Sequence, residues 1–232
     1  MRGTQSSSTT KRELLQPDTN DNAATSVSEI DLLQDGDFGI RGGYRISNPL
    51  PWFVIFQGRT LCSGSLIHGD IILTAAHCVD DNGIPPSVRV GSTDYFSGGT
   101  VVGVSGGEIY PEWTMGKPSD PDLAIVVLDQ FLNNDIAILN FDSELPEPNH
   151  NTLFTMGHGL INDSQSSRTL QGADIPYIDD CSDVSRSYER FRHICTDSRN
   201  VATCGGDSGM FCVLLIQCCI LRCALLLQKK TY

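Results

Sequence analysis

The sequence has few basic residues, with 16 Lys and Arg against 28 Asp and Glu in 232 residues. The formal net charge of -12 argues against nucleic acid and against an anionic membrane surface as partners, because both repel an acidic protein. A long apolar run is also missing. The stretch 211–227 falls short of the ~20 apolar residues that a membrane span needs, and Arg222 interrupts it. We therefore expect neither nucleic acid nor a membrane as a partner.

Motifs that bind zinc are lacking as well. The chain has nine cysteines, but no Cys-x-x-Cys pair and no Cys/His spacing typical of zinc, so we expect no metal and no cofactor. Cys62 and Cys78 instead flank a strand-turn-strand pattern, and Cys181 and Cys195 flank a short polar segment. This paired spacing predicts two disulfides, Cys62–Cys78 and Cys181–Cys195, formed in an oxidising compartment.

The N-terminal segment 1–39 is rich in Ser, Thr, Asp and Asn and poor in apolar residues, which predicts a disordered leader or pro-segment. No apolar signal-peptide core is visible in it. Either the true start is missing or the protein is not exported by that route. The cysteine pattern favours the first alternative, and we expect an extracellular or secretory-pathway protein.

Long helical periodicity is absent, and from Pro51 the chain reads as short strands separated by Gly, Pro, Asn and Asp. Such spacing indicates an antiparallel all-β barrel or sandwich. The strands that we expect in the first half cover residues 52–56, 60–67, 71–75, 87–92 and 99–104.

Three stretches contain the residue types of a nucleophilic triad. The run LTAAHC carries His77, the run DLAIVVL begins with Asp122, and the motif GGDSG carries Ser208. The order His, Asp, Ser is one of the few known for such triads. In this combination, residues 40–209 resemble the chymotrypsin/trypsin family of serine endopeptidases.

The resemblance implies an all-β fold of two antiparallel six-stranded-type barrels with the catalytic groups between them. The first barrel would cover about 40–140 and the second about 141–209. Two further pieces are similar to the family. These are the strand VRVGS at 88–92 and the turn GHG at 157–159, where His158 replaces the family's Trp.

The resemblance also assigns roles in peptide-bond hydrolysis through an acyl-enzyme. Ser208 would be the nucleophile, His77 the general base and later the acid, and Asp122 the group that orients the imidazole. The backbone amides of Gly206 and Ser208 would form the oxyanion hole. Ala202 would lie at the base of the specificity pocket. It lacks the carboxylate that selects Arg or Lys, so we expect a small or apolar preference in protein or peptide substrates, with protein protease inhibitors as further partners.

Asp122 has a rival in Asp135, because the run NDIAIL at 134–139 locally matches the family's Asp motif even better. Spacing favours Asp122. The interval from Asp122 to the GHG turn is near the family's interval, whereas the interval from Asp135 is too short. We therefore predict that Asp135 is a surface turn residue.

The run IRGG at 40–43 resembles the family's mature N-terminus, so the chain would be a zymogen. Cleavage would free the amine of Ile40 to pair with Asp207. Gly39, which stands where the family has Arg or Lys, predicts that a trypsin-like activator does not cut here. Arg41 also replaces an apolar residue of the family.

After Gly209 the sequence departs from the family. The C-terminal tail, residues 210–232, is rich in Cys and Leu and lacks the expected Gly-Pro turn and further strands. It leaves Cys204 without its usual partner. We expect an incomplete second barrel and weak or absent peptide hydrolysis, with a truncated product as the explanation of the tail. The alternatives to an endopeptidase are a catalytically inactive homologue that acts as a binding module and a truncated, non-functional product.

Overall fold

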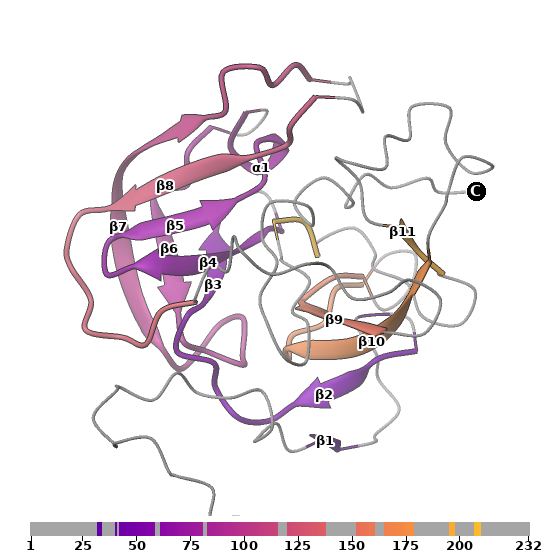
Figure 1. The fold of residues 1–232 in the computed structure, drawn as a ribbon. Coiled ribbons are helices and arrows are strands. Elements are labelled where there is room, and N and C mark those ends of the chain that lie inside the picture. The colour runs from indigo at the N-terminus through magenta and orange to yellow at the C-terminus, as the bar shows by residue number, and fades with distance from the viewer. Residues whose placement is uncertain are drawn as a thin grey trace, which may run out of the picture.

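The fold is all-β and is described here from a computed structural model (Figure 1). Strands pair antiparallel throughout the described part of the chain, and the one helix described there, α1 (His77–Asp80), is a single turn. The structure describes residues 32–33, 40, 42–58, 61–80, 83–115, 120–137, 152–160, 165–178, 195–197 and 207–209. Within these ranges, no helix has the length and apolar character needed to cross a membrane.

Six strands of the first half close into a barrel in the order β3-β4-β5-β8-β7-β6, with β3 paired to β6. Alternate residues of β8 are buried, as expected for a strand with one face on a core. The barrel interior is filled by fully buried apolar side chains such as Val54, Phe56, Leu66, Ile72 and Val126. The barrel strands are β3 (Phe53–Gln57), β4 (Ser63–His68), β5 (Ile71–Thr74), β6 (Ser87–Val90), β7 (Thr100–Ile109) and β8 (Ala124–Leu128).

The remaining strands form a second sheet around β10, which pairs with β2, β9 and β11. Strand β1 extends this sheet beyond β2. The described strands do not close into a second barrel. They are β1 (Leu32–Leu33), β2 (Tyr44–Ile46), β9 (Thr152–Gly157), β10 (Gln171–Ile178) and β11 (Cys195–Thr196).

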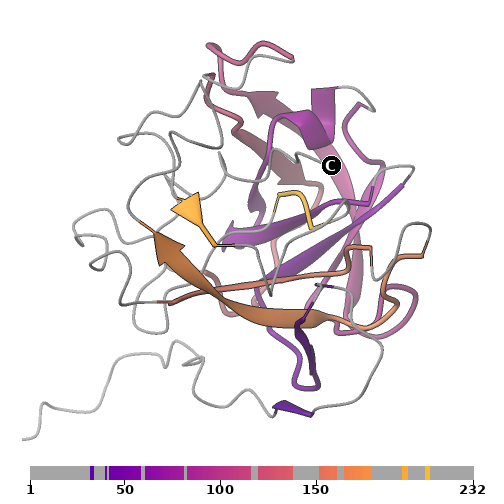
Figure 2. The same ribbon diagram turned by 90° about the vertical axis from the view of Figure 1, so that its right-hand side faces the viewer.

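The two parts share one apolar core. Ile46, Phe154, Met156 and Leu170 from the second part belong to the same buried cluster as the barrel interior. The views in Figures 1 and 2 agree that β9 and β10 lie beside the barrel, and that the yellow segment 207–209 lies between the two parts. The boundary between the halves is therefore the natural place for a site.

This architecture confirms the predicted all-β fold with an incomplete second barrel, and each predicted first-half strand overlaps an observed one. One assignment needs correction. Strand β2 lies inside the range predicted for the first barrel, but it pairs with β10 of the second sheet. Strand β1 lies inside the segment predicted to be disordered; the rest of 1–39 lies outside the described residues.

Candidate active site

The imidazole of His77 is fixed by one carboxylate. His77 begins α1, directly after β5, and Asp122 lies just before β8, the strand that pairs with β5. The ring nitrogen Nδ1 of His77 lies 2.5 Å from Oδ2 of Asp122. The backbone N–H of His77 donates a 2.9 Å hydrogen bond to Oδ1 of the same carboxylate. Since an ionised carboxylate only accepts, Nδ1 carries the proton and the lone pair of the ring is on Nε2.

The structure places Asp122, and not Asp135, against His77. The side chain of Asp122 is 2% exposed, which suits a group that acts only on the histidine. Asp135 is an exposed residue of the segment after β8. The register of β5 and β8 explains why Asp122 is the partner of His77. Thr74 at the end of β5 pairs with Ala124 at the start of β8, which brings His77 and Asp122 together.

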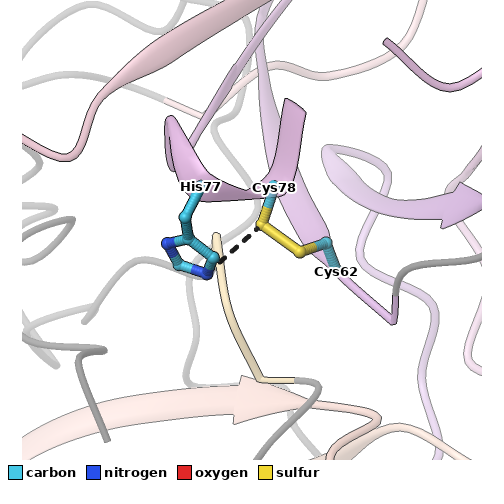
Figure 3. Close-up of side chains that lie close together, drawn as sticks. All are labelled: Cys62, His77 and Cys78. Carbon is cyan, nitrogen blue, oxygen red and sulfur yellow. Dashed lines mark hydrogen bonds between the residues drawn. A yellow bond between two sulfur atoms is a disulfide. The ribbon is translucent and has the colours of Figure 1, made fainter. Parts of the chain in front are cut away.

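A disulfide joins Cys78, next to His77, to Cys62, the residue just before β4. This confirms the first predicted pair. Both cysteines are buried, at 2% and 1% exposure, and Nε2 of His77 lies 3.7 Å from Sγ of Cys78 (Figure 3). The bridge ties α1 to the barrel wall, so the turn that carries the histidine is cross-linked close to its base.

The Ser208 segment docks on the first barrel through its backbone. The carbonyl oxygen of Ser208 accepts a 2.8 Å hydrogen bond from the N–H of Ser63, the neighbour of Cys62. Gly209 has φ +81°, and a Cβ atom there would collide with the carbonyl oxygen of Ser63 and the hydroxyl of Thr74. The Gly of the GGDSG motif is thus required both by its backbone angle and by the close approach to β4.

Asp207 is fully buried beside the GHG turn of the second part. Its Oδ1 accepts a 2.8 Å hydrogen bond from the N–H of Gly159. Cβ atoms at Gly157 or Gly159 would collide with this carboxylate, so the two glycines provide its space. The segment around Ser208 is therefore held from both sides, by β4 through Ser208 and by the GHG turn through Asp207.

Ile40 is also fully buried, in a small cluster with Ala173 and Ile175 of β10. Its carbonyl oxygen accepts a 2.8 Å hydrogen bond from Gly43. The predicted pairing of a freed Ile40 amine with Asp207 stays a prediction.

His158, the residue that replaces the family's Trp, is 1% exposed and contacts the rings of Phe53 and Tyr95. Its Nδ1 lies 3.1 Å from the carbonyl oxygen of Ser167, and its Nε2 has no hydrogen-bond partner in the described part of the chain. Burial lowers the pKa of His158 to about 4, although the Ser167 carbonyl and the Asp94 carboxylate act to raise it. The imidazole is therefore neutral at pH 7, and its ring packs between the second part and the aromatic rings of the first.

Several predicted residues lie outside the described ranges. These are Arg41, the oxyanion-hole residue Gly206, the pocket residue Ala202, Cys204 and the C-terminal tail 210–232. The predicted bridge Cys181–Cys195 also lies outside them, because Cys181 is not described.

Sequence reasoning missed the residues that seat the Ser208 segment. Thr74 donates from Oγ1 to the carbonyl of Ser63 at 2.8 Å, and Ser63 in turn binds Ser208. Thr74 lies inside the LTAAHC run, so a signal was present in the sequence. Ser63 carried none, because its role depends on its backbone N–H.

Together, a closed barrel, a second sheet, a carboxylate-bound histidine and a docked Asp-Ser-Gly segment define the class of two-part all-β serine hydrolases. Comparison with known proteins agrees. A model of the Trypsin family matches residues 40–211. The chain belongs to the trypsin family of serine endopeptidases.

Three relatives illustrate the range of similarity. Hypodermin-A of Hypoderma lineatum is 28% identical over 198 residues, covering 79% of this chain and 76% of that protein. Trypsin iota of Drosophila melanogaster is 27% identical over 180 residues, covering 73% and 71%. Ovochymase of Halocynthia roretzi is 29% identical over 73% of this chain, which spans only 12% of that much longer protein.

Among solved structures, the scabies mite inactivated protease paralogue S-D1 aligns with a TM-score of 0.59 at 21% sequence identity, covering 70% of this chain and 76% of that one. At this identity the likeness supports the fold alone.

Proposed function

We propose that this chain is an endopeptidase that hydrolyses peptide bonds of proteins through an acyl-enzyme, with Ser208 as nucleophile, His77 as general base and Asp122 as orienting group. The observation that carries the proposal is the 2.5 Å contact between Nδ1 of His77 and Oδ2 of Asp122. A serine hydroxyl is a weak nucleophile at neutral pH and needs a base whose lone pair is aimed at it. The Asp122 contact selects the tautomer with that lone pair on Nε2.

In the first half-reaction, Nε2 of His77 takes the proton from Oγ of Ser208 as Oγ attacks the carbonyl carbon of the substrate. The imidazolium that forms is stabilised by the buried Asp122 carboxylate and then gives its proton to the leaving amine. Water repeats the sequence on the acyl-enzyme and releases the acid. The backbone N–H groups of Gly206 and Ser208 bind the developing oxyanion, each contributing about 3 kcal/mol.

Regulation and specificity follow from the family roles. A freed Ile40 amine pairs with Asp207 and stiffens the segment around Ser208, which makes the chain a zymogen. The burial of both Ile40 and Asp207 supports this role. Ala202 leaves the specificity pocket without a carboxylate, so small or apolar side chains are preferred. The disulfide between Cys62 and Cys78 supports an extracellular or secretory location, since such bonds persist in oxidising compartments.

A second function is a catalytically inactive homologue that acts as a binding module. The departure of the C-terminal tail from the family pattern favours this second function and predicts weak peptide hydrolysis. The two functions share the fold and differ only in whether Ser208 is activated.

A fluorophosphonate probe distinguishes them, because it forms a bond with an activated serine and needs no specificity pocket. We expect labelling of the chain with a native Ile40 terminus, slower labelling of the full-length chain, and none in a Ser208→Ala variant. A His77→Ala variant with normal circular dichroism serves as a second control and should lose most of the rate. Equal labelling of wild type and Ser208→Ala, or no labelling of any form, would refute the endopeptidase proposal. Rapid turnover of peptides would instead contradict the weak hydrolysis expected from the tail.

A further inference from the structure

The indole of Trp113 contacts the helical turn that carries His77. Nε1 of Trp113 donates a 2.9 Å hydrogen bond to Oδ2 of Asp80, the last residue of α1. His77 is the first residue of the same turn, so this bond holds the end of α1 that lies away from the histidine in sequence. We propose that Trp113 is a positioning residue for the proposed base: through Asp80 it fixes the orientation of α1 and hence of the imidazole.

The turn α1 (Figure 3) is too short to be stable by itself. The backbone N–H groups of 78–80 donate to the carbonyl oxygens of 75–76 at 2.9–3.2 Å. A helical nucleus of this length is unfavourable in isolation, so tertiary contacts must fix it. The orientation of the imidazole therefore depends on where α1 is attached to the rest of the barrel.

Three side-chain contacts attach α1 at its beginning, middle and end. In order, these are the bond from the N–H of His77 to Asp122, the disulfide of Cys78, and the bond from Trp113 to Asp80. Two attachment points leave a turn free to rotate about the line that joins them, whereas a third point removes this rotation. The Trp113 bond is thus the contact that prevents α1 from tilting the imidazole away from its carboxylate.

Trp113 is itself held on the segment that carries Asp122. The N–H of Trp113 donates to the carbonyl oxygen of Tyr110 at 2.9 Å, and the N–H of Tyr110 donates to that of Leu123 at 2.8 Å. Leu123 follows Asp122 directly. The turn 110–113 thus connects the backbone beside the orienting carboxylate to the last residue of the turn that carries the base. Both groups of the dyad are therefore held by one set of contacts.

The chemistry of the bond suits a fixed link. An indole N–H only donates and a carboxylate only accepts, and a hydrogen bond to a charged acceptor is stronger than a neutral one. The ring of Trp113 is half-buried and packs on the main apolar cluster, so little side-chain freedom is lost when the bond forms. Although Asp80 is exposed, the donor that it meets is therefore already in place.

This role rests on the proposed function, because the orientation of the imidazole matters for catalysis only if His77 is the base. A misplacement of ~1 Å in a catalytic site can cost ~10²-fold in rate. Loss of the Trp113 bond should tilt the imidazole by less than this and lower the maximal rate of fluorophosphonate labelling about 10-fold. The reagent concentration that gives half of the maximal rate should change little, because access to the site is unaltered.

The test compares variants of the full chain that circular dichroism shows to be folded. Trp113→Phe keeps most of the ring packing and removes the donor, and Asp80→Ala removes the acceptor. Each change should lower the maximal labelling rate about 10-fold. The double variant should lose no more than either single variant, because both act through one bond. Asp80→Asn retains an acceptor oxygen and should keep a rate close to that of the wild type.

A second measurement does not depend on activity. The ring ¹⁵N signals of His77, assigned by their disappearance in His77→Ala, report which ring nitrogen carries the proton. The wild type should show a protonated Nδ1 and an unprotonated Nε2. In Trp113→Phe the two chemical shifts should move towards each other as the other tautomer becomes populated. Glu112→Gln, a change at an exposed acidic residue of the same turn, is the matched control and should leave both measurements unchanged.

Losses that multiply in the double variant would overturn the proposal, as would unchanged ¹⁵N shifts in Trp113→Phe. A rate for Asp80→Asn as low as that for Asp80→Ala would do the same. Should the wild type not be labelled at all, the proposed function fails, and the ¹⁵N shifts still decide whether Trp113 positions His77.

Discussion

The two halves of the molecule contribute to the site in different ways. The first barrel is closed, and it supplies both His77 and Asp122 from the ends of two paired strands. The described part of the second half is an open sheet, and it supplies the GHG turn that holds Asp207. Ser208 belongs to neither sheet, and its segment is bound by Ser63 of the barrel and, through Asp207, by Gly159 of the second half. The base is therefore preset by one rigid unit, whereas the nucleophile depends on two.

The position of His77 therefore depends on the first barrel alone, whereas the position of Ser208 depends on both halves. A change in the first barrel that leaves its hydrogen bonds intact should leave the base in place. A change at the boundary between the two halves (the junction) should first alter the position of Ser208. Four predictions test this division, and the one with the largest effect comes first.

Replacing Asp122 by Asn should reduce the rate of fluorophosphonate labelling about 10⁴-fold, because the amide can donate to Nδ1 and favour the wrong tautomer of His77. Asp135→Asn is the matched control, since this residue is exposed and should leave the rate unchanged. Kinetics of labelling at pH 7 measure both. A loss in the Asp135 variant that equals the loss in the Asp122 variant would contradict the assignment of the two carboxylates.

Replacing Phe56 by Ala should lower the free energy of unfolding by about 5 kcal/mol, near the upper end for a buried aromatic residue, because a closed barrel cannot collapse into the cavity. The matched change Phe154→Ala removes an equally buried ring from the open sheet and should cost less, about 3 kcal/mol, because the open sheet can relax. Urea unfolding measures both variants. A larger loss at Phe154 would show that the second half is the more rigid of the two.

The junction should also respond to acid through His158. Its pKa is lowered by burial from 6.5 to about 4 in the folded chain, so between these values the unfolded state binds more protons. The contribution of neutral His158 to the free energy of unfolding is fully present above pH 6.5. It falls as the pH drops towards 4, by on the order of 3 kcal/mol in total. Below pH 4 the folded chain binds the proton as well, and this contribution falls no further.

The variant His158→Asn tests this, because its amide N–H can replace the donor Nδ1–H and does not titrate. Urea unfolding between pH 4 and pH 7 should show a flatter profile for it than for the wild type. An unchanged slope in His158→Asn would mean that other groups cause the acid sensitivity.

Much of this architecture could be predicted from residues because its signals are local. Short β-rich runs ending in Gly or Asp marked the strands, and the LTAAHC and GGDSG motifs marked His77 and Ser208. The choice of Asp122 over Asp135 needed spacing, since both motifs look alike locally. The role of β2 could not be predicted from its three residues, because partner choice depends on β10, far along the chain.

The role of Ser63 could not be predicted either, because its backbone N–H seats Ser208 without any side-chain signal.

The smallest effect should come from the ion pair that crosses the junction at the surface. Arg168 donates from Nε to Oδ2 of Asp94 at 2.7 Å, and its guanidinium lies 5.8 Å from the ring centre of Phe96. The Arg168 side chain is 65% exposed, and pairs of this kind contribute about 0.2–1 kcal/mol. Arg168→Met keeps much of the packing and removes the charge. The free energy of unfolding, measured with urea, should therefore fall by less than about 1 kcal/mol, and the difference from wild type should be smaller still in high salt.

Asp94→Ala is the informative partner of this change. Oδ1 of Asp94 also accepts hydrogen bonds from the N–H groups of Phe96 and Ser97, both at 2.9 Å. Although burial raises the pKa of Asp94, the hydrogen bonds from Arg168, Phe96 and Ser97 lower it to about 2. The free energy of unfolding should therefore fall more in Asp94→Ala, which frees the loop 94–97, than in Arg168→Met. Backbone hydrogen bonds from Tyr95 to Arg168 and from Leu170 to Thr93 remain in both variants and hold the two halves together. Equal losses in the two variants would mean that the ion pair itself, and not the loop that Asp94 orders, connects the halves.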